Sequence, residues 1–495
     1  MATKKRNHWL ILVLLALAQF MVVLDVSIVN VALPSIARQF NMSQTSLQWI
    51  VTAYTLAFGG FLLLGGRAAD LFGRRKLFLA GTAVFGIASL LDGLSPSGGF
   101  LIALRAAQGL AAAFMSPAAL SIVLVTYKEG HERNLALSVW GAVASGGAAA
   151  GVLLGGIITQ YLNWRWNFFI NVPVAMFVIF AGLRWLDAHE SEETHNDLDL
   201  PGAVSITAAL MLLVYGIVKA PANGWTAGST LGFLGASVAL IAYFIWNERR
   251  AQYPLVPFHI FSIRNVTGAN LAMMPIVAGM FSTFFFISLY TQTVLGYSPV
   301  KTGVSFLTIP LIIGLTASNI PRLVKRIGFK PILVVAPLFT GSALFWFSHV
   351  RVGGNYVHDL LPGFILMGLG MGATFIAITI AATSGVPRRE SGLASGILNT
   401  SQQVGGALGL AILTGIATSA FTRHLQTLHH APSQLDKLTA QVHGYHEAFL
   451  VSTCFLIGAS ILAALILKQP KLSAAEAEKE ASIGAVGPRV YSRRD

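Results

Sequence analysis

Fourteen long apolar stretches divide this sequence, and they constrain its fold more than any other feature. Each stretch has roughly 19 to 28 residues, which is enough for an α-helix to cross a hydrocarbon layer of about 30 Å. Only helices or closed barrels satisfy their backbone hydrogen bonds in lipid, so the sequence predicts an all-α polytopic membrane protein. The predicted spans are 9–33, 47–66, 77–95, 100–126, 134–159, 167–186, 200–219, 229–247, 266–291, 302–320, 331–350, 359–384, 392–419 and 446–467.

The composition agrees, because 55% of the 495 residues are hydrophobic and only 11% are charged, a balance that a soluble fold of this length cannot bury. The net charge of +13 does not indicate a nucleic-acid partner, because the basic residues are spread over many loops. About 25 Lys and Arg residues fall on the side of the termini and about 7 on the other. This bias predicts a multi-pass protein of the cytoplasmic (inner) membrane with both termini cytoplasmic.

The sequence offers no sign of a cofactor or a metal site. It contains no G-x-x-x-x-G-K-[S/T] phosphate loop, and Cys454 is its only cysteine. Five histidines follow the thirteenth span in a spacing that fits no tight metal site, so a solvated loop is the favoured interpretation; they are His424, His429, His430, His443 and His446. We therefore expect transport driven by an ion gradient, or downhill transport.

Two sequence patterns occur twice, which indicates two related halves. Residues 66–76 are echoed at 321–330, and residues 133–138 are echoed at 390–395. Duplicated six-span halves with a site between them are a common transporter design. The predicted organisation is a first six-helix bundle over 1–190, inserted helices seven and eight over 191–250, a second six-helix bundle over 251–470 and a disordered cytoplasmic tail over 471–495.

Several of these motifs resemble the major facilitator superfamily and, within it, the fourteen-span drug:proton antiporter family. Residues 24–34 are similar to the first-helix signature of that family, residues 66–76 to its G-x-x-x-D-x-x-G-R-[K/R] loop, and residues 105–109 to its R-x-x-Q-G motif. Residues 164–173, 296–299 and 399–406 extend the similarity over nearly the whole chain. The resemblance implies the major facilitator fold and multidrug efflux by alternating access.

Asp25 is the only carboxylate that we place well inside a predicted span. A charge there costs roughly 2.5–3.5 kcal/mol, so a functional role is the first hypothesis and a structural ion pair is the alternative. Asp25 and Arg105 both fall in the outer half of their spans and could meet. Burial favours an uncharged Asp25 and a nearby Arg105 favours a charged one, so a change in their distance would change proton affinity. The resemblance implies the same roles, with Asp25 as proton carrier and Arg105 as its modulator.

A single embedded carboxylate also limits the cargo. One proton exchanged for one monocation moves no net charge through a membrane potential worth about 2.3 kcal/mol per 100 mV, so we predict neutral or monocationic substrates over dications. Aromatic surfaces with few polar anchors suit amphipathic ligands. The candidate residues for the substrate cavity are Asn30, Tyr54, Gln108, Phe284 and Asn399.

The loop after the second span is a candidate cytoplasmic gate. Asp70 ends that span and could accept hydrogen bonds from Arg74 or from the next helix, while Gly66 and Gly73 would permit close approach and a tight turn. Arg75 belongs to the same basic group, which would enforce topology in any case.

The fifth predicted span carries a glycine series at Gly147, Gly151, Gly155 and Gly156 that is similar to the glycine-rich antiporter motif. Glycines four residues apart let helices pack closely in lipid, so close packing and a role in controlling leak are both open. The family pattern has proline where this chain has Val152.

The favoured function is proton-coupled antiport that exports drugs, dyes or antiseptics, with no enzymatic activity. The alternatives are an exporter of a specific lipid, siderophore or metabolite, a proton symporter, and a sensor or scaffold that does not transport. Each chain contains a complete pathway, so we expect a monomer to function with only substrate, protons and lipid as partners. The glycine series favours antiport, and Asp25 argues against a scaffold.

Overall fold

The structure is a computed structural model that describes residues 8–128, 130–186, 198–387 and 390–469. Within these ranges it contains helices and no strand, and fourteen helical segments are long and apolar enough to cross a membrane. The predicted all-α polytopic fold is therefore confirmed. The predicted tail at 471–495 lies outside the described residues, as do residues 187–197, where the first bundle was predicted to give way to the inserted pair.

The helices follow one another in three groups. The first half contains α1 (His8–Phe40), α2 (Gln44–Leu47), α3 (Trp49–Phe72), α4 (Arg74–Gly93), α5 (Gly98–Thr126), α6 (His131–Tyr161), α7 (Trp166–Phe169) and α8 (Asn171–Trp185). The inserted pair is α9 (Leu200–Asn223) and α10 (Gly228–Arg250). The second half contains η1 (Phe258–Ser262), α11 (Arg264–Leu289), η2 (Tyr290–Val294), α12 (Pro299–Phe306), α13 (Thr308–Ala317), α14 (Ile320–Ile327), α15 (Phe329–Phe347), η3 (Tyr356–Leu360), α16 (Leu361–Thr383), α17 (Ser391–Gln426) and α18 (Gln434–Ile466).

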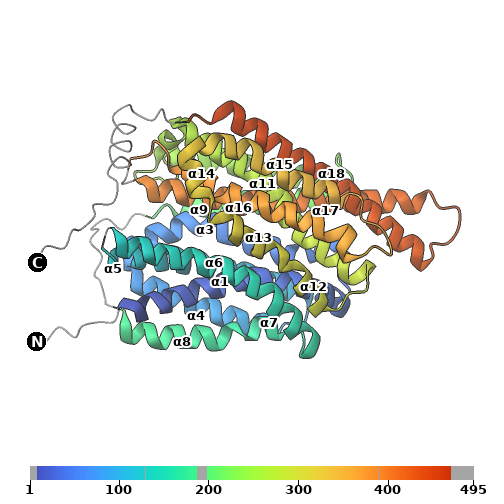
Figure 1. The fold of residues 1–495 in the computed structure, drawn as a ribbon, viewed down its shortest axis with the longest axis horizontal. Helices are drawn as coiled ribbons and strands as arrows, with labels where there is room; N and C mark the ends of the chain where they lie inside the picture. Colours follow the sequence, from blue (N-terminus) through green and yellow to red (C-terminus); the bar gives the residue numbers. More distant parts are fainter. Residues whose placement is uncertain (1–7, 129, 187–197, 388–389, 470–495) are drawn as a thin grey trace, which may run out of the picture.

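The last two helices are longer than the sequence predicted. Helix α17 continues to Gln426, and α18 begins at Gln434, where Ser433 and Asp436 form a capping box. These added turns are polar, so the apolar pattern that identified the spans could not reveal them. Figure 1 shows the two helices projecting together beyond the other helices.

An even number of spans returns the chain to the face where it started, so His8 and Ile466 lie at one face of the molecule. We call this the terminal face and the other the distal face. Figure 1 shows the two halves lying side by side between these faces. The turn from α3 to α4 lies at the terminal face and the turn from α4 to α5 at the distal face.

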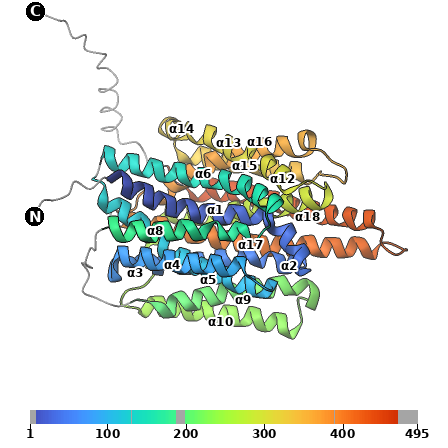
Figure 2. The same ribbon diagram turned by 90° about the horizontal axis from the view of Figure 1, so that it is seen from below.

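The inserted pair runs along one edge of the molecule (Figure 2). Helix α9 packs against α3 of the first half and α17 of the second, and Gly60 lies so close to Thr207 that a methyl group there would clash. Helix α10 is mostly exposed and is held to α9 by a 2.8 Å hydrogen bond from Ser237 Oγ to the carbonyl oxygen of Ala209. Helix α9 therefore bridges the halves, and α10 faces lipid.

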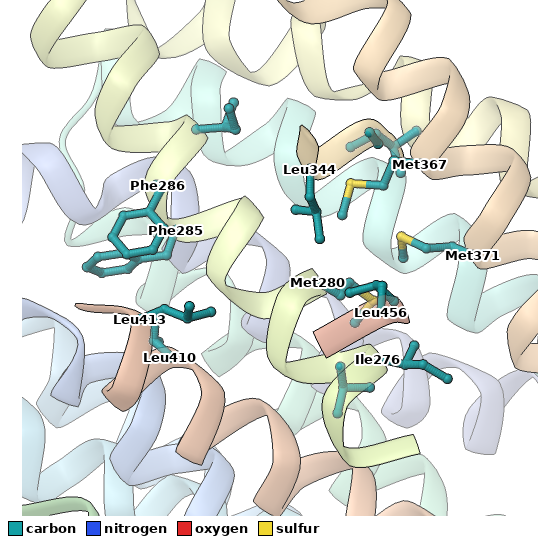
Figure 3. Close-up of a cluster of buried hydrophobic side chains, with 14 of the residues drawn as sticks. Ile276, Met280, Phe285, Phe286, Leu344, Met367, Met371, Leu410, Leu413 and Leu456 are labelled. Carbon is teal, nitrogen blue, oxygen red and sulfur yellow. The ribbon is translucent and has the colours of Figure 1, made fainter. Parts of the chain in front are cut away.

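The interior of the second half is apolar. A large cluster of buried side chains fills it, and Figure 3 shows a part that includes Ile276, Met280, Phe285, Phe286, Leu344, Met367, Met371, Leu410, Leu413 and Leu456. Many polar side chains buried in this half form hydrogen bonds with the backbone of their own helix. Ser282 and Thr283, for example, donate to carbonyl oxygens one turn earlier on α11. In the first half, by contrast, buried polar side chains of several helices bond to one another.

The two halves are joined closely toward the distal face. Ser288 Oγ donates to the carbonyl oxygen of Asn30 at 2.7 Å, and Gln292 Nε2 donates to that of Val31 at 2.9 Å. Helices α6 and α12 also touch, because a Cβ added at Gly156 would lie 2.5 Å from the carbonyl oxygen of Pro299.

Toward the terminal face the same neighbourhood is open. A Cβ added at Gly141 or Gly146 of α6, or at Gly314 of α13, would meet no atom within 4 Å. The halves still touch at another place, where Thr400 Oγ1 of α17 donates to the carbonyl oxygen of Gly59 of α3 at 3.3 Å. Helices α6 and α12 are thus in close contact near the distal face, while Gly141, Gly146 and Gly314, nearer the terminal face, contact no other helix in the described part of the chain.

Two adjacent glycines in α3 differ sharply in their surroundings. A methyl group at Gly65 would lie 2.1 Å from the backbone oxygen of Ala113, whereas at Gly66 the nearest atom, Cβ of Pro117, is 3.8 Å away. We predict that Gly65→Ala destabilises the protein by about 1–3 kcal/mol through overpacking and lowers its thermal unfolding temperature in detergent. Gly66→Ala is the matched control and should unfold at or above the wild-type temperature, since alanine favours helix. Equal effects of the two substitutions would contradict this packing.

Candidate functional site

Asp25 lies about halfway along α1, and its side chain is 0% exposed. Its carboxylate accepts three hydrogen bonds from other helices. Arg105 Nη1 donates to Oδ2 at 2.5 Å, while Gln108 Nε2 and Asn171 Nδ2 donate to Oδ1 at 3.0 and 2.9 Å. A buried carboxylate needs this number of donors to remain charged.

Arg105 is the cationic partner and is 1% exposed. It lies on α5 one turn before Gln108, so both side chains reach the same face of that helix. Arg105 Nε donates to the carbonyl oxygen of Ile50, and Nη1 also donates to Oε1 of Gln108 at 2.5 Å. Its guanidinium carbon lies 4.3 Å from the ring centroid of Tyr54 and 5.8 Å from that of Phe168. The structure thus brings Asp25 and Arg105 together and covers the pair with aromatic rings.

One further polar residue, Ser89, completes this cluster. We call it the Asp25 network, and it consists of Asp25, Arg105, Gln108, Asn171 and Ser89. Ser89 Oγ accepts from Gln108 at 2.7 Å and from Asn171 at 3.3 Å. The five residues come from four helices, α1, α4, α5 and α8. Sequence reasoning missed Ser89 and Asn171, although Asn171 stands inside the quoted motif at 164–173.

The energetics of such a pair are asymmetric. Burying two charges costs several kcal/mol each, and their attraction offsets this only with good geometry and further hydrogen bonds. Removing one partner leaves a buried charge uncompensated, at a cost of about 3–5 kcal/mol. Substitution of either Asp25 or Arg105 alone is therefore expected to destabilise the protein more than substitution of both.

A second acid of the first half is buried, although it lies at the end of its span rather than well inside it. Asp92, in the last turn of α4, is also 0% exposed, and neither of its carboxylate oxygens has a hydrogen-bond partner within the described part of the chain. Sequence reasoning overlooked it because it lies close to the predicted end of its span, where acidic residues are usually solvated. The nearby turn is folded inward instead, and Arg165 donates to the carbonyl oxygens of Gly93 and Ser95.

The candidate cavity residues do not form one set. Gln108 belongs to the Asp25 network, and Tyr54 lies under Arg105 and is buried. The side chain of Asn30 bonds to the carbonyl oxygen of Val26 one turn earlier and is partly exposed. Gln108 is therefore better described as a network residue than as a substrate contact.

The remaining two cavity candidates lie in the second half. Phe284 is partly buried, with its ring centroid 5.5 Å from that of Phe306. Asn399 is exposed although it lies about two turns inside α17. An amide at this depth is unfavourable in hydrocarbon, so its exposure favours a water-filled space beside α17.

The loop between α3 and α4 has its expected local geometry. Gly73 has a φ of +94°, a conformation that favours glycine, and Gly328 between α14 and α15 has a φ of +82°. Asp70 is 46% exposed on its side chain and pairs with Arg74 one turn away, with Nε and Nη2 at 3.1 and 3.0 Å. Arg75 donates to the carbonyl oxygen of Leu183 at the end of α8.

Two details of this loop differ from expectation. Close helix approach occurs at Gly65 rather than at Gly66, because Gly65 is the residue that faces α5. Within the described residues, the hydrogen bonds of Asp70 join it to Arg74 alone, so this arrangement shows no link from Asp70 to the second half.

The glycine series of α6 packs on two different neighbours. Gly147, Gly151 and Gly155 face α1, where added Cβ atoms would meet atoms of Phe20, Val23, Leu24, Ser27 and Ile28 at 3.4 Å or less. Gly156 faces α12 instead. Helix α6 runs unbroken through Val152, whose carbonyl oxygen would lie 2.3 Å from a Cβ added at Gly303. The series therefore holds α6 against Asp25's own helix.

Among the described residues, no group of three or more His, Cys, Asp or Glu side chains is arranged to hold a metal ion. His424 and His443 lie near each other, with ring centroids 5.1 Å apart, at the projecting ends of α17 and α18.

Comparisons with known proteins agree with this architecture. The sequence profile of the Major Facilitator Superfamily matches residues 15–410. The puromycin resistance protein of Streptomyces alboniger is 40% identical, over 98% of this chain and 96% of that protein. The cephamycin export protein of Amycolatopsis lactamdurans is 36% identical over 91% of each chain. The multidrug resistance protein Stp of Mycobacterium tuberculosis is 32% identical, over 85% of this chain and 78% of that protein.

Solved structures of transporters share the fold. A peptide transporter POT in complex with sulfate superposes with a TM-score of 0.65 at 17% identity, covering 92% of this chain and 96% of that one. A bacterial homolog of the human lysosomal transporter Spinster, in an inward-facing and unoccupied conformation, gives a TM-score of 0.67 at 14% identity, covering 94% and 100%. At these identities the likeness concerns the fold alone.

The position of Tyr54 generates a testable prediction. Its hydroxyl has no hydrogen-bond partner within the described residues, while its ring covers Arg105. Tyr54→Phe should therefore leave the thermal unfolding temperature and transport near wild type. Tyr54→Leu should cost about 2 kcal/mol, because a desolvated cation–π contact is lost. A Tyr54→Phe variant as unstable as Tyr54→Leu would show that the hydroxyl, rather than the ring, matters.

Proposed function

The chain belongs to the major facilitator superfamily, and from this premise we propose that it exports small amphipathic organic compounds in exchange for protons, by alternating access. Membership makes it a transporter rather than an enzyme. The observation that carries the proposal is the Asp25 network, in which one carboxylate and one cation are buried inside the first half. Burying an ion pair costs desolvation energy, and apolar residues would hold the helices together at a lower cost. A role in binding and releasing protons would explain why the pair is present.

In the proposed cycle, Asp25 is the proton carrier and Arg105 its modulator. A proton on Asp25 removes the charge that holds Arg105, and three donors then face a neutral acid. This weakens the links that Asp25 of α1 makes to α5 and α8. Because α1 also carries the distal contacts to Ser288 and Gln292, a shift of α1 would affect the closure between the halves. Protonation and opening are thereby coupled through one helix.

We assign the terminal face to the cytoplasm and the protein to the cytoplasmic (inner) membrane. Basic side chains at the terminal face support this orientation, because positive charge is retained on the cytoplasmic side. They include Arg74, Arg75, Arg249, Arg250, Lys325 and Arg326. The close contacts between the halves near the distal face then lie on the side opposite the cytoplasm. We infer that the monomer suffices and that the proton gradient is the only energy source.

Two parts of the cycle have structural candidates. The loop of Gly66, Asp70, Gly73, Arg74 and Arg75 is proposed to close the cytoplasmic side, where the exposed Asp70 is free to exchange its local partner for one on the second half. The glycine face of α6, made of Gly147, Gly151, Gly155 and Gly156, is proposed to limit proton leak by holding α6 and α1 in contact.

We propose neutral or monocationic cargo that contacts Asn30, Phe284 and Asn399. The second half supports this choice, because from residue 264 to residue 434 it contains only Asp359 and Glu390 as acids, both at helix ends. Export of one particular metabolite is the second candidate. It is favoured by the relatives, whose names refer to puromycin resistance and cephamycin export.

Asp25→Asn should abolish coupling. In proteoliposomes with an internal pH dye, we expect substrate-driven proton movement to fall at least about tenfold, since no titrating group remains at the network's centre. Glu447→Gln removes a partly exposed carboxylate of α18, paired with Arg423 far from the network, and should behave as wild type. Wild-type proton release from Asp25→Asn would overturn the proposed role, and proton movement in the same direction as substrate would indicate symport.

Cargo charge can be tested with matched dyes. Monocationic and bis-cationic forms of one dye scaffold should be exported at rates that differ by about tenfold or more in favour of the monocation, because one proton cannot balance two positive charges against the membrane potential. Efflux of the bis-cationic form at the monocation's rate would contradict the cargo proposal without affecting the proposed role of Asp25.

A further inference from the structure

Asp92 is a buried carboxyl group that the proposed cycle does not use. It is 0% exposed, and both of its oxygens lack a hydrogen-bond partner within the described residues. It lies one residue before the end of α4, which is the end nearest the distal face. Asp25, by contrast, lies about halfway along α1, so Asp92 is the acid of the pair closer to the distal face.

The surroundings of Asp92 disfavour a negative charge. An unpaired carboxylate in an apolar environment is very costly and takes up a proton instead. The C-terminal end of a helix also carries partial negative charge, which opposes a carboxylate in the last turn. Arg165 approaches this turn, but its hydrogen bonds go to the carbonyl oxygens of Gly93 and Ser95.

Asp92 lies one turn after Ser89 on α4, so it is on the helix face that meets Gln108 and the rest of the Asp25 network. Arg105 Nε donates to the carbonyl oxygen of Ile50, and Nη1 donates to Asp25 and Gln108. Nη2 makes no hydrogen bond within the described part of the chain. One buried cation, paired with Asp25, thus lies in the same network region as a second, unpaired buried carboxyl group. Asp25, Asp92 and the Arg105 cation have no net charge together when one of the two carboxyl groups is protonated. A net charge at this depth is costly.

We propose that Asp92 is a second proton-binding site that holds a proton while Asp25 is paired with Arg105, and that it becomes the counterion of Arg105 when Asp25 is protonated. In this exchange the O–H bond of Asp92 breaks, an O–H bond forms on Asp25, and Arg105 changes its hydrogen-bonded partner. The total charge of the three groups does not change. Each turnover still moves one proton, as the cargo proposal requires.

The exchange makes Asp92 the loading site for protons that arrive from the distal face. This inference rests on the proposed proton coupling and extends it by a relay. The titratable or charged groups near this end of α4, on the elements packed around it, are Arg105 on α5, Tyr54 on α3, Asp25 on α1 and Arg165 before α7. Helix α7 and the adjacent end of α8 contribute none.

Infrared difference spectra test the protonation states without any transport. Wild type minus Asp92→Asn should show the C=O band of a protonated carboxyl group at neutral pH. Wild type minus Asp25→Asn should show the same band, because Asp92 becomes the only acid beside Arg105 and ionises. Asp359→Asn is the control and should show no such band, since Asp359 is paired with Arg351 and accepts from the backbone N–H of Asn355. A wild-type spectrum without an Asp92 band would overturn the proposal.

Transport measurements then test the relay. Asp92→Asn should keep proton-independent substrate counterflow and its thermal unfolding temperature, because the carboxylate has no hydrogen bonds to lose. Its proton-coupled flux should fall about tenfold when the distal medium is alkaline and return toward wild type when that medium is acidic. Asp92→Glu should restore the alkaline rate. A wild-type pH profile in Asp92→Asn, with coupling still lost in Asp25→Asn, would reject the relay and leave the proposed function standing.

Discussion

The buried pair of Asp25 and Arg105 is the interaction on which the rest of this molecule depends. The pair links four helices, α1, α3, α5 and α8. Arg105 of α5 also donates to the carbonyl oxygen of Ile50 in the first turn of α3, and Asp25 of α1 accepts hydrogen bonds from α5 and α8. Such a pair adds little to folding stability, since apolar residues of the same volume often give a protein that is equally or more stable. The second half shows this contrast directly, because its interior is filled by Leu, Met and Phe side chains. The buried ion pair thus lies in the first half, whereas the interior of the second half is mainly apolar.

Most of the fold could be predicted from the sequence because lipid leaves few choices. Each of the fourteen spans was found, since hydrophobic length alone identifies a helix that crosses a bilayer. The sequence predictions were inaccurate at the ends of helices, where the chain passes from lipid to water. The ends of α17 and α18 extend on polar residues through a capping box at Ser433, which hydropathy does not detect. The inward fold of the turn after Asp92 was missed for the same reason.

The candidate site was predictable only in part. An aspartate and an arginine inside apolar spans are conspicuous, and their depths suggested that they could meet. Ser89 and Asn171 gave no such signal, because serine and asparagine are common in helices that pack in lipid. Gln108 was predicted as a cavity residue, and its place in the Asp25 network was not foreseen, since the sequence does not tell which face of α5 points toward α1. Gly65 and Gly66 illustrate the same limit, because adjacent residues on a helix point about 100° apart and only three-dimensional packing decides which one is crowded.

The hairpin of α17 and α18 has a practical consequence for handling the protein. Helices of 36 and 33 residues are about 54 and 50 Å long, well beyond a hydrocarbon layer of about 30 Å. The excess forms a rigid, polar protrusion that remains outside a detergent micelle. At the base of this protrusion, the buried Tyr445 accepts a hydrogen bond from Gln44 of the first half at 3.2 Å. An antibody fragment that recognises both sides of this junction would select one conformation and add the soluble mass that a transporter of this size lacks for image alignment in electron cryomicroscopy.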